Sequence, residues 1–85
     1  MDYPARTPEH LGQLLKSCRA QRGLSQRAAG AKVGLKQSTV SVIEADAART
    51  SVESLYKLLS SLQLELVIRD TRADGSPSGP QQREW

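Results

Sequence analysis

The 85-residue sequence predicts a mainly α-helical domain of four to five short helices, followed by one short β-strand. The helices are predicted because apolar residues recur at helical spacing, and because each run lies between residues that commonly begin or end a helix. The strand is predicted because apolar and polar side chains alternate near the end of the domain. The expected order is an N-terminal arm over 1–7, a helical domain over 8–62, a strand over 63–70 and a disordered tail over 71–85.

The composition narrows the ways in which so small a domain can be stabilised. One cysteine, Cys18, and one histidine, His10, exclude a disulfide framework and a four-ligand zinc site within one chain, which leaves self-association. The sequence shows neither an apolar run that could span a membrane nor a signal peptide, and a single unpaired cysteine fits the cytoplasm. It also lacks a nucleophile–base pair and a phosphate-binding glycine loop, so we expect neither an enzyme nor a cofactor.

Positive charge is concentrated in the first part of the chain. Residues 1–50 contain eight lysines and arginines against four acids, a net charge of +4, whereas residues 51–85 contain four against five, a net charge of −1. A basic half suits a polyanion partner, but so small an excess also serves solubility alone. Charge by itself leaves these two explanations equally open.

Capping signals and apolar stripes define the first two helices. The first is expected to begin at Thr7 and to end at Gly23, and Cys18 on its buried stripe is expected to be a core thiol. The second is expected to begin at Ser25 and to end at Gly34, where a glycine followed by an apolar residue is the Schellman pattern.

Two further helices follow. The third spans 37–45 and is separated from the second by only Gly34, Leu35 and Lys36. Two short helices joined by such a turn form a helix-turn-helix arrangement, although the same pattern also fits an ordinary pair of packed helices. The fourth is expected to be capped by Thr50 and to bury a regular apolar stripe: Val52, Leu55, Leu58, Leu59 and Leu62.

The third helix has a polar face of an unusual kind. Val40 and Ile43 are spaced to face a core. The opposite face carries four other residues: Gln37, Ser38, Ser41 and Val42. A helix surface that meets only water usually carries long charged side chains. These short hydrogen-bonding groups, with one methyl-bearing residue among them, indicate a face that contacts a partner.

The segment 64–70 is the expected strand, in which Leu64, Leu66 and Ile68 alternate with Glu65, Val67 and Arg69. The chain offers it no partner strand, so it either continues the fourth helix in frayed form or pairs with another chain. Its β-branched content favours pairing, and a second copy is the simplest partner. Residues 71–85 cannot form a core. Trp85 in this tail is either an anchor for a partner pocket or a chance occurrence.

The stretch LSQRAAGAKVGLKQSTVSVIE, residues 24–44, resembles the second and third helices of the lambda-repressor-like helix-turn-helix family, also called the Xre family. The matching residues are Ser25, Gln26, Gly34, Leu35, Val40, Ser41, Ile43 and Glu44. The resemblance extends over 8–62 and implies the lambda-repressor-like fold. It departs from the family at Ala29 and Gly30, where leucine and alanine are usual.

A narrower resemblance covers the order of parts. GLKQSTVS, the segment LELVIRD after the fourth helix and a polar tail ending in EW are together similar to the HipB antitoxins. In that family the strand pairs with its twin in a homodimer, the dimer represses its own operon by binding operator DNA, and it neutralises a HipA-type serine/threonine kinase toxin. The resemblance implies the same partners here and makes Trp85 the candidate toxin contact. It places four residues in the dimer strand: Leu64, Leu66, Val67 and Ile68.

Family positions and the chemistry of base edges together indicate the DNA contacts. Glutamine bonds an adenine edge, serine meets donors or acceptors, lysine suits guanine, and valine methyls meet a thymine methyl. The expected base readers are Lys36, Gln37, Ser38 and Ser41, with Val42 less firmly assigned. The candidates for backbone contact or bracing are Ser25, Gln26, Arg27, Thr39 and Arg49. Arg27, Thr39 and Arg49 fit phosphate contact and a purely solvated surface equally well. By the family pattern, Glu44 points inward and pairs with Arg19, outside the binding site.

Two other functions remain open on the sequence. One is a stand-alone, phage-repressor-like regulator of transcription without a toxin partner, which a neighbouring kinase gene would exclude. The other is a protein-interaction adaptor that uses the same helices without DNA. Weak, salt-insensitive retention on DNA would favour the adaptor, because phosphate contacts make affinity fall steeply with salt.

Overall fold

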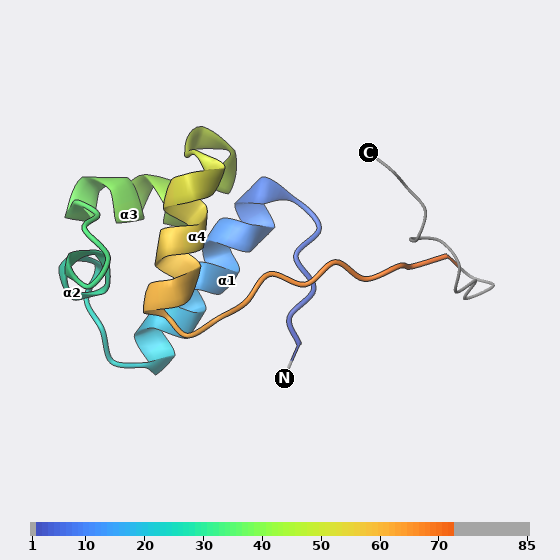
Figure 1. The fold of residues 1–85 in the computed structure, drawn as a ribbon, viewed down its shortest axis with the longest axis horizontal. Helices are drawn as coiled ribbons and strands as arrows, with labels where there is room; N and C mark the ends of the chain where they lie inside the picture. Colours follow the sequence, from blue (N-terminus) through green and yellow to red (C-terminus); the bar gives the residue numbers. More distant parts are fainter. Residues whose placement is uncertain (1, 73–85) are drawn as a thin grey trace.

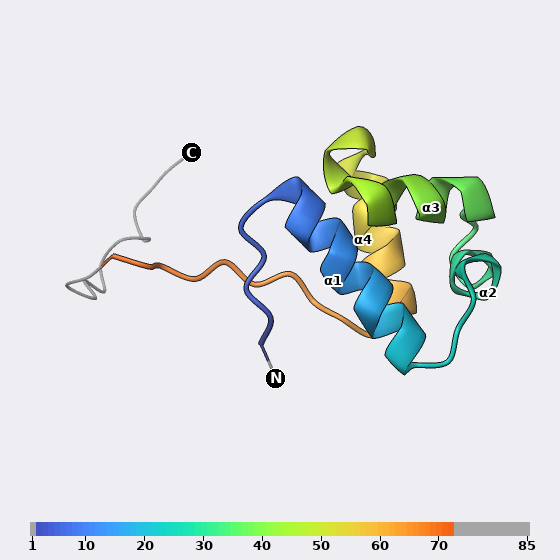
Figure 2. The same ribbon diagram turned by 180° about the vertical axis from the view of Figure 1, so that it is seen from behind.

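The computed structural model describes residues 2–72 and arranges them as a bundle of short helices (Figure 1). The elements are α1 (Pro8–Gln21), α2 (Gln26–Ala31), α3 (Gln37–Ala45), a 3-10 helix η1 (Ala47–Arg49) and α4 (Val52–Ser61). Helices α2 and α3 lie at one end of the molecule, and the N-terminal arm and the segment after α4 extend at the other (Figure 2). The expected mainly α-helical bundle is confirmed.

The core draws on every helix of this bundle. Its buried apolar side chains are Leu15, Cys18, Ala29, Val40, Ile43, Ala47, Leu58, Leu59 and Leu62. Cys18 is 3% exposed, as expected of a core thiol. Burying one large apolar side chain contributes about 1.5–3 kcal/mol, so a handful of such residues is enough to hold short helices that would be unstable alone.

The N-terminal caps agree with the sequence at two helices and differ at the third. The hydroxyls of Thr7 and Ser25 accept the backbone N–H three residues on, at 3.0 Å in both cases, as expected for α1 and α2. The expected cap of α4 at Thr50 is wrong. Ser51 has the extended backbone of a cap and accepts the N–H of Ser54 at 3.1 Å, so the helix begins one residue later.

Three helices end in the same Schellman turn. The 6→1 hydrogen bonds run from the N–H of Leu24, Leu35 and Leu64 to the carbonyls of Arg19, Gly30 and Leu59. The residue before each leucine has a positive φ: Gly23, Gly34 and Gln63. The expected stop at Gly34 is thus confirmed as a turn, although the regular part of α2 already ends at Ala31.

One residue of the expected apolar stripe of α4 does not join the core. Val52 is 67% exposed, whereas Leu58 and Leu62 are fully buried. Val52 lies at the edge of the stripe, one helical turn before Tyr56, which is 51% exposed. The two residues form an apolar strip on the outer side of α4. On α2, Ala29 is buried, whereas Ala28 and Ala31 are exposed.

The segment 64–70 leaves α4 as an extended chain, so the interpretation in which it continues the fourth helix is wrong. It makes no β-ladder within residues 2–72, and its pairing with a second copy stays a prediction. An exposed ion pair joins Arg69 to Asp2 of the N-terminal arm. Most of the expected tail, including Trp85, lies outside the described residues. None of the helices in the described part of the chain is long and apolar enough to cross a bilayer.

Candidate nucleic-acid interface

The surface of α3 is divided as its sequence predicts. Val40 and Ile43 are fully buried, while Thr39 and Val42 at the margins are half-buried. The exposed residues of the first two turns are Gln37, Ser38 and Ser41. The helix therefore presents a strip of amide and hydroxyl groups to the surroundings.

A glycine brings α3 close to α1. A Cβ built on Gly12 would lie 2.6 Å from the carbonyl oxygens of both Ile43 and Glu44, too close for any other residue at this position without a backbone shift. Sequence reasoning missed Gly12, although a glycine inside a helical pattern is a signal of close packing. Because Gly12 has no side chain, the backbone of α3 can pack directly against α1.

A buried carboxylate ties three elements together at the start of the helix-turn-helix unit. Glu44 of α3 has a side chain only 3% exposed and accepts from Arg19 of α1 at 2.6 and 3.1 Å. Gln26 Nε2 of α2 donates to the same carboxylate at 3.0 Å. Arg19 Nη1 also donates to the carbonyl of Leu24 in the α1–α2 loop, at 2.8 Å. The geometry matches the inward position of Glu44 and the bracing position of Gln26 that the family pattern implies.

The ion pair with Glu44 stabilises the charged form of Arg19. The hydrogen bond to Glu44 is the largest effect on Arg19 and raises the pKa of its guanidinium above the ordinary value, although burial opposes the shift. A raised pKa on a base means that the stabilisation is fully present below the ordinary pKa and is lost only as pH rises through the raised one. The contribution of the charged Arg19 to the stability of the fold is therefore constant through the neutral pH range.

The turn between α2 and α3 is tightly packed, and Gly30 is the reason. A Cβ at Gly30 would lie 2.4 Å from the carbonyl oxygen of Leu35 and 3.1 Å from a methyl of Val40. The glycine that departs from the family pattern thus lets the backbone after α2 fold back onto the helix. The result places Lys36 at the first turn of α3.

Lys36 begins α3 without capping it. Its backbone is extended, as an N-cap requires, but its side chain makes no capping hydrogen bond, in contrast to Thr7, Ser25 and Ser51 at the other α-helices. A Ser, Thr, Asp or Asn at this position typically stabilises a helix by about 1 kcal/mol relative to a non-capping residue. The exposed ammonium of Lys36 therefore stands where helix stability alone favours another residue, beside Gln37 and Ser38.

The remaining candidates fall into two groups. Arg27 in α2 and Arg49 in η1 are exposed, and they lie on the elements that precede and follow α3. Ser25 is exposed, but its hydroxyl is already occupied as the α2 cap, and Gln26 is half-buried against Glu44. The structure thus gathers the expected base readers on one helix face, while Ser25 and Gln26 support the helices internally.

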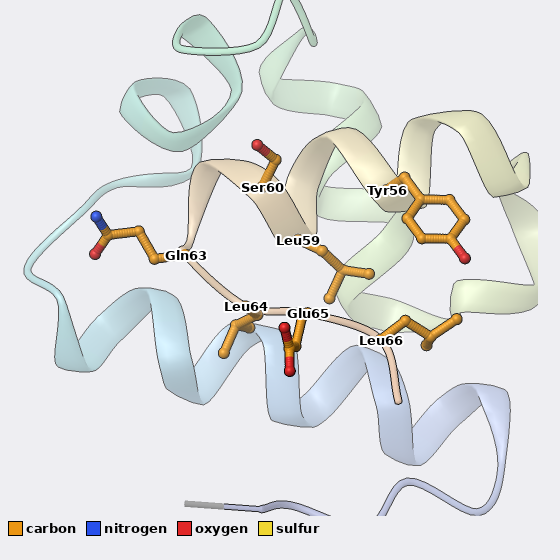
Figure 3. Close-up of a pocket in the computed structure, with 7 residues that line it drawn as sticks. All are labelled: Tyr56, Leu59, Ser60, Gln63, Leu64, Glu65 and Leu66. Atoms are coloured by element: carbon orange, nitrogen blue, oxygen red, sulfur yellow. The ribbon is translucent and has the colours of Figure 1, made fainter. Parts of the chain in front are cut away.

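A second surface is formed by α4 and the extended segment. A shallow pocket of about 460 Å³ is lined by Tyr56, Leu59, Ser60, Gln63, Leu64, Glu65 and Leu66 (Figure 3). The side chains of Tyr56, Leu59 and Leu66 point into the same space. Beyond it, Val67 is 61% and Ile68 is 92% exposed. Three of the expected strand residues, Leu66, Val67 and Ile68, are therefore exposed apolar surface in the single chain, whereas Leu64 packs against the core.

Comparisons with known proteins give one consistent answer. The family described as "Helix-turn-helix" matches residues 15–68. Antitoxin HipB of Escherichia coli O6:H1 (strain CFT073) is 33% identical over 81 residues, which cover 93% of this chain and 85% of the relative. Antitoxin HipB of Escherichia coli strain K12 is 32% identical, with 93% and 91% covered. These relatives are antitoxins rather than enzymes.

Solved structures of HipB are similar to this chain as well. A "HipB-O4 20mer complex" has a TM-score of 0.78 and 30% identity, covering 84% of this chain and 100% of that one. The "Structure of HipA-HipB-O2-O3 complex" has a TM-score of 0.78, 31% identity and the same coverage. Fold and sequence therefore agree, and the chain belongs to the helix-turn-helix family and, within it, to the HipB antitoxins.

Proposed function

We propose that the protein is the antitoxin of a type II toxin–antitoxin pair. In this proposal a homodimer binds operator DNA, represses its own operon and neutralises a HipA-type serine/threonine kinase. The observation that carries the proposal is the exposed strip of α3, whose amide and hydroxyl groups have no partner among the described residues and follow directly on Lys36. The solved complexes of similar HipB chains with 20mers and with HipA support it.

The chemistry of the α3 strip suits base edges in the major groove. Gln37 can donate to and accept from one adenine, and Lys36 can donate to guanine O6 and N7. Ser38 and Ser41 are short enough to let the helix approach, and each hydroxyl both donates and accepts. These four residues are the proposed base readers. Val42 is half-buried at the margin, and in this proposal its methyls meet a thymine methyl.

Contacts with phosphates are proposed on either side of the reading helix. Arg27 and Arg49 are exposed on α2 and η1, so an α3 helix in the groove brings both toward the flanking backbone. Thr39 is half-buried and is a weaker candidate. Phosphate contacts of this kind fix the register of the protein but carry no sequence information. Operator binding also places the protein where the chromosome is, in the cytoplasm.

The proposed dimer contact is the second surface. The outer strip of α4, the pocket beside it and the apolar side chains of Leu66, Val67 and Ile68 are exposed in a single chain. Pairing two extended segments would satisfy their backbone hydrogen bonds and cover Leu66 and Val67. A twofold dimer would then present two α3 helices to two half-sites of an operator.

Gln37→Ala tests the reading helix. We expect operator affinity to fall by about 1–3 kcal/mol and the preference at one base pair per half-site to flatten, with salt dependence unchanged. The fold should be retained, because Gln37 is exposed and lies opposite Val40 and Ile43. The measurement is a titration against operator and scrambled DNA at several salt concentrations. Binding of both DNAs as by the parent would show that α3 does not read bases.

Arg27→Ala is the matched comparison in the same titration. If Arg27 contacts a phosphate, its loss weakens binding to all sequences equally and reduces the salt slope by about one per protomer. The two variants therefore have opposite signatures. An unchanged salt slope would show that Arg27 is a solvated surface residue without a phosphate contact.

Removal of residues 83–85 tests the toxin contact. Trp85 lies outside the described residues, and its assignment rests on resemblance to the HipB antitoxins. We expect weaker binding to a HipA-type kinase, because a tryptophan is a common anchor in a partner pocket, and constant operator affinity. Calorimetry with the purified kinase is the measurement, and Trp85→Ala separates the side chain from the shortened tail. Equal kinase affinity with and without these residues would make Trp85 a chance occurrence.

A further inference from the structure

Helix α4 is tied to the helix-turn-helix unit by one buried hydroxyl. Ser61 Oγ donates to the carbonyl oxygen of Ala29 at 2.7 Å, across 32 positions of the chain. Ser61 is 6% exposed and Ala29 is fully buried. Helix α4 packs against α2 in the described structure. The bond thus joins the end of α4 to the end of α2.

The acceptor is a carbonyl that α2 leaves unsatisfied. The last four carbonyls of a helix have no donor within it, and α2 ends only two residues after Ala29. The backbone N–H groups after the helix donate to a different carbonyl. Those of Val33 and Leu35 both donate to the carbonyl of Gly30, at 3.0 and 2.9 Å. Ser61 therefore supplies to Ala29 a hydrogen bond that the turn itself does not.

The end of α2 leads directly into the reading helix. Gly30, next to Ala29, packs so closely on the carbonyl of Leu35 that a Cβ would not fit between them. Lys36 and Gln37 are the next residues in the chain. A close-packed turn of this kind moves as a unit, so a displacement at Ala29 is passed to the first turn of α3.

We propose that Ser61 is a positioning residue for operator recognition, which transmits the position of α4 to the turn that carries Lys36 and Gln37. The inference rests on the proposed function, in which the outer face of α4 forms the dimer contact. In a twofold dimer the two α3 helices must match half-sites at a fixed separation. The Ser61–Ala29 bond links each α3 helix to the element that sets this separation.

Three serine variants test the proposal. Ser61→Ala removes the hydroxyl, Ser61→Cys refills its volume with a weak donor, and Ser17→Ala makes the same change on the exposed surface of α1. Each is titrated against an operator selected from random DNA, the same operator with one base pair added between its half-sites, and scrambled DNA. All titrations are made at a temperature at which circular dichroism shows every variant folded.

We expect Ser61→Ala to lose about five- to tenfold in operator affinity, the equivalent of one hydrogen bond. The ratio between correctly spaced and respaced operator should shrink by a similar factor, with scrambled DNA unaffected. Ser61→Cys should follow Ser61→Ala, and Ser17→Ala should follow the parent. Hydrogen exchange at the Leu35 amide should be faster in Ser61→Ala than in the parent.

Two results would overturn the positioning role of Ser61 and leave the proposed function intact. A lower melting temperature with an unchanged spacing ratio would make the role of Ser61 structural only. Parent-like recognition by Ser61→Cys would assign the effect of Ser61→Ala to packing volume. A parent protein that does not distinguish operator from scrambled DNA is a different failure, since it overturns the proposed function and the positioning role with it.

Discussion

An Arg19→Met variant should lose about 3–5 kcal/mol of its free energy of unfolding, the typical cost of stranding one partner of a buried ion pair. The side chain of Glu44 is 3% exposed, and without Arg19 its hydrogen-bond donor in the described structure is Gln26. The carbonyl of Leu24 loses its guanidinium donor as well. Urea denaturation, with the midpoint and slope fitted together, measures the loss.

An exposed ion pair in the same chain provides the control. Glu53 and Lys57 of α4 are four residues apart with side chains 81% and 46% exposed, so Glu53→Gln should cost no more than about 0.5 kcal/mol. A loss below about 1 kcal/mol for Arg19→Met would contradict the account, because values that small are typical of surface pairs. The network would then not hold α1, α2 and α3 in register.

A proline in the extended segment should abolish the dimer. Proline removes a backbone donor and is not tolerated within a paired ladder. Only alternate N–H groups of a two-stranded ladder face the partner, so Val67→Pro and Ile68→Pro are made in parallel, and one of them must remove a ladder bond. Sedimentation analysis should show at least one variant as a monomer at concentrations at which the parent is a dimer.

Val67→Thr is the matched control, since threonine keeps the N–H and the β-branched shape that strands favour. It should remain dimeric with an affinity close to that of the parent. If both proline variants dimerise as the parent does, residues 64–70 are not the interface. The apolar strip of Val52 and Tyr56 would then have to form the contact without the strand.

Most of the fold could be predicted from the sequence because the residues that begin and end the helices are local signals. Thr7 and Ser25 cap their helices, and Gly23 and Gly34 end theirs with positive φ. The error at Thr50 came from two adjacent hydroxyl residues that both fit a cap, and local signals place helix ends only to within a residue or two. Gln63 adopts a positive φ that side-chain-bearing residues rarely take, and no sequence rule indicates it.

Tertiary packing decided what the sequence could not. Val52 belongs to the apolar stripe by spacing, yet the core ends before it reaches that side of α4. Ser61 carries no local signal of its role, and the glycine at position 12 signals close packing without indicating its partner, because each residue meets a backbone carbonyl far along the chain. The α3 face was found from sequence because short polar residues opposite Val40 and Ile43 break the usual pattern of a solvated helix.

The central claim is that a twofold dimer reads DNA with the α3 strip, and selection from random-sequence DNA by the 85-residue chain tests it most directly. Bound fragments are recovered over several rounds at physiological salt and sequenced. The account predicts enrichment of a pseudo-palindrome whose half-sites lie about 34–36 Å apart centre to centre, or a multiple of that distance, with the motif lost for Gln37→Ala at one position per half-site. Recovery of fragments without a common motif, or of the same motif by the parent and Gln37→Ala, would contradict it.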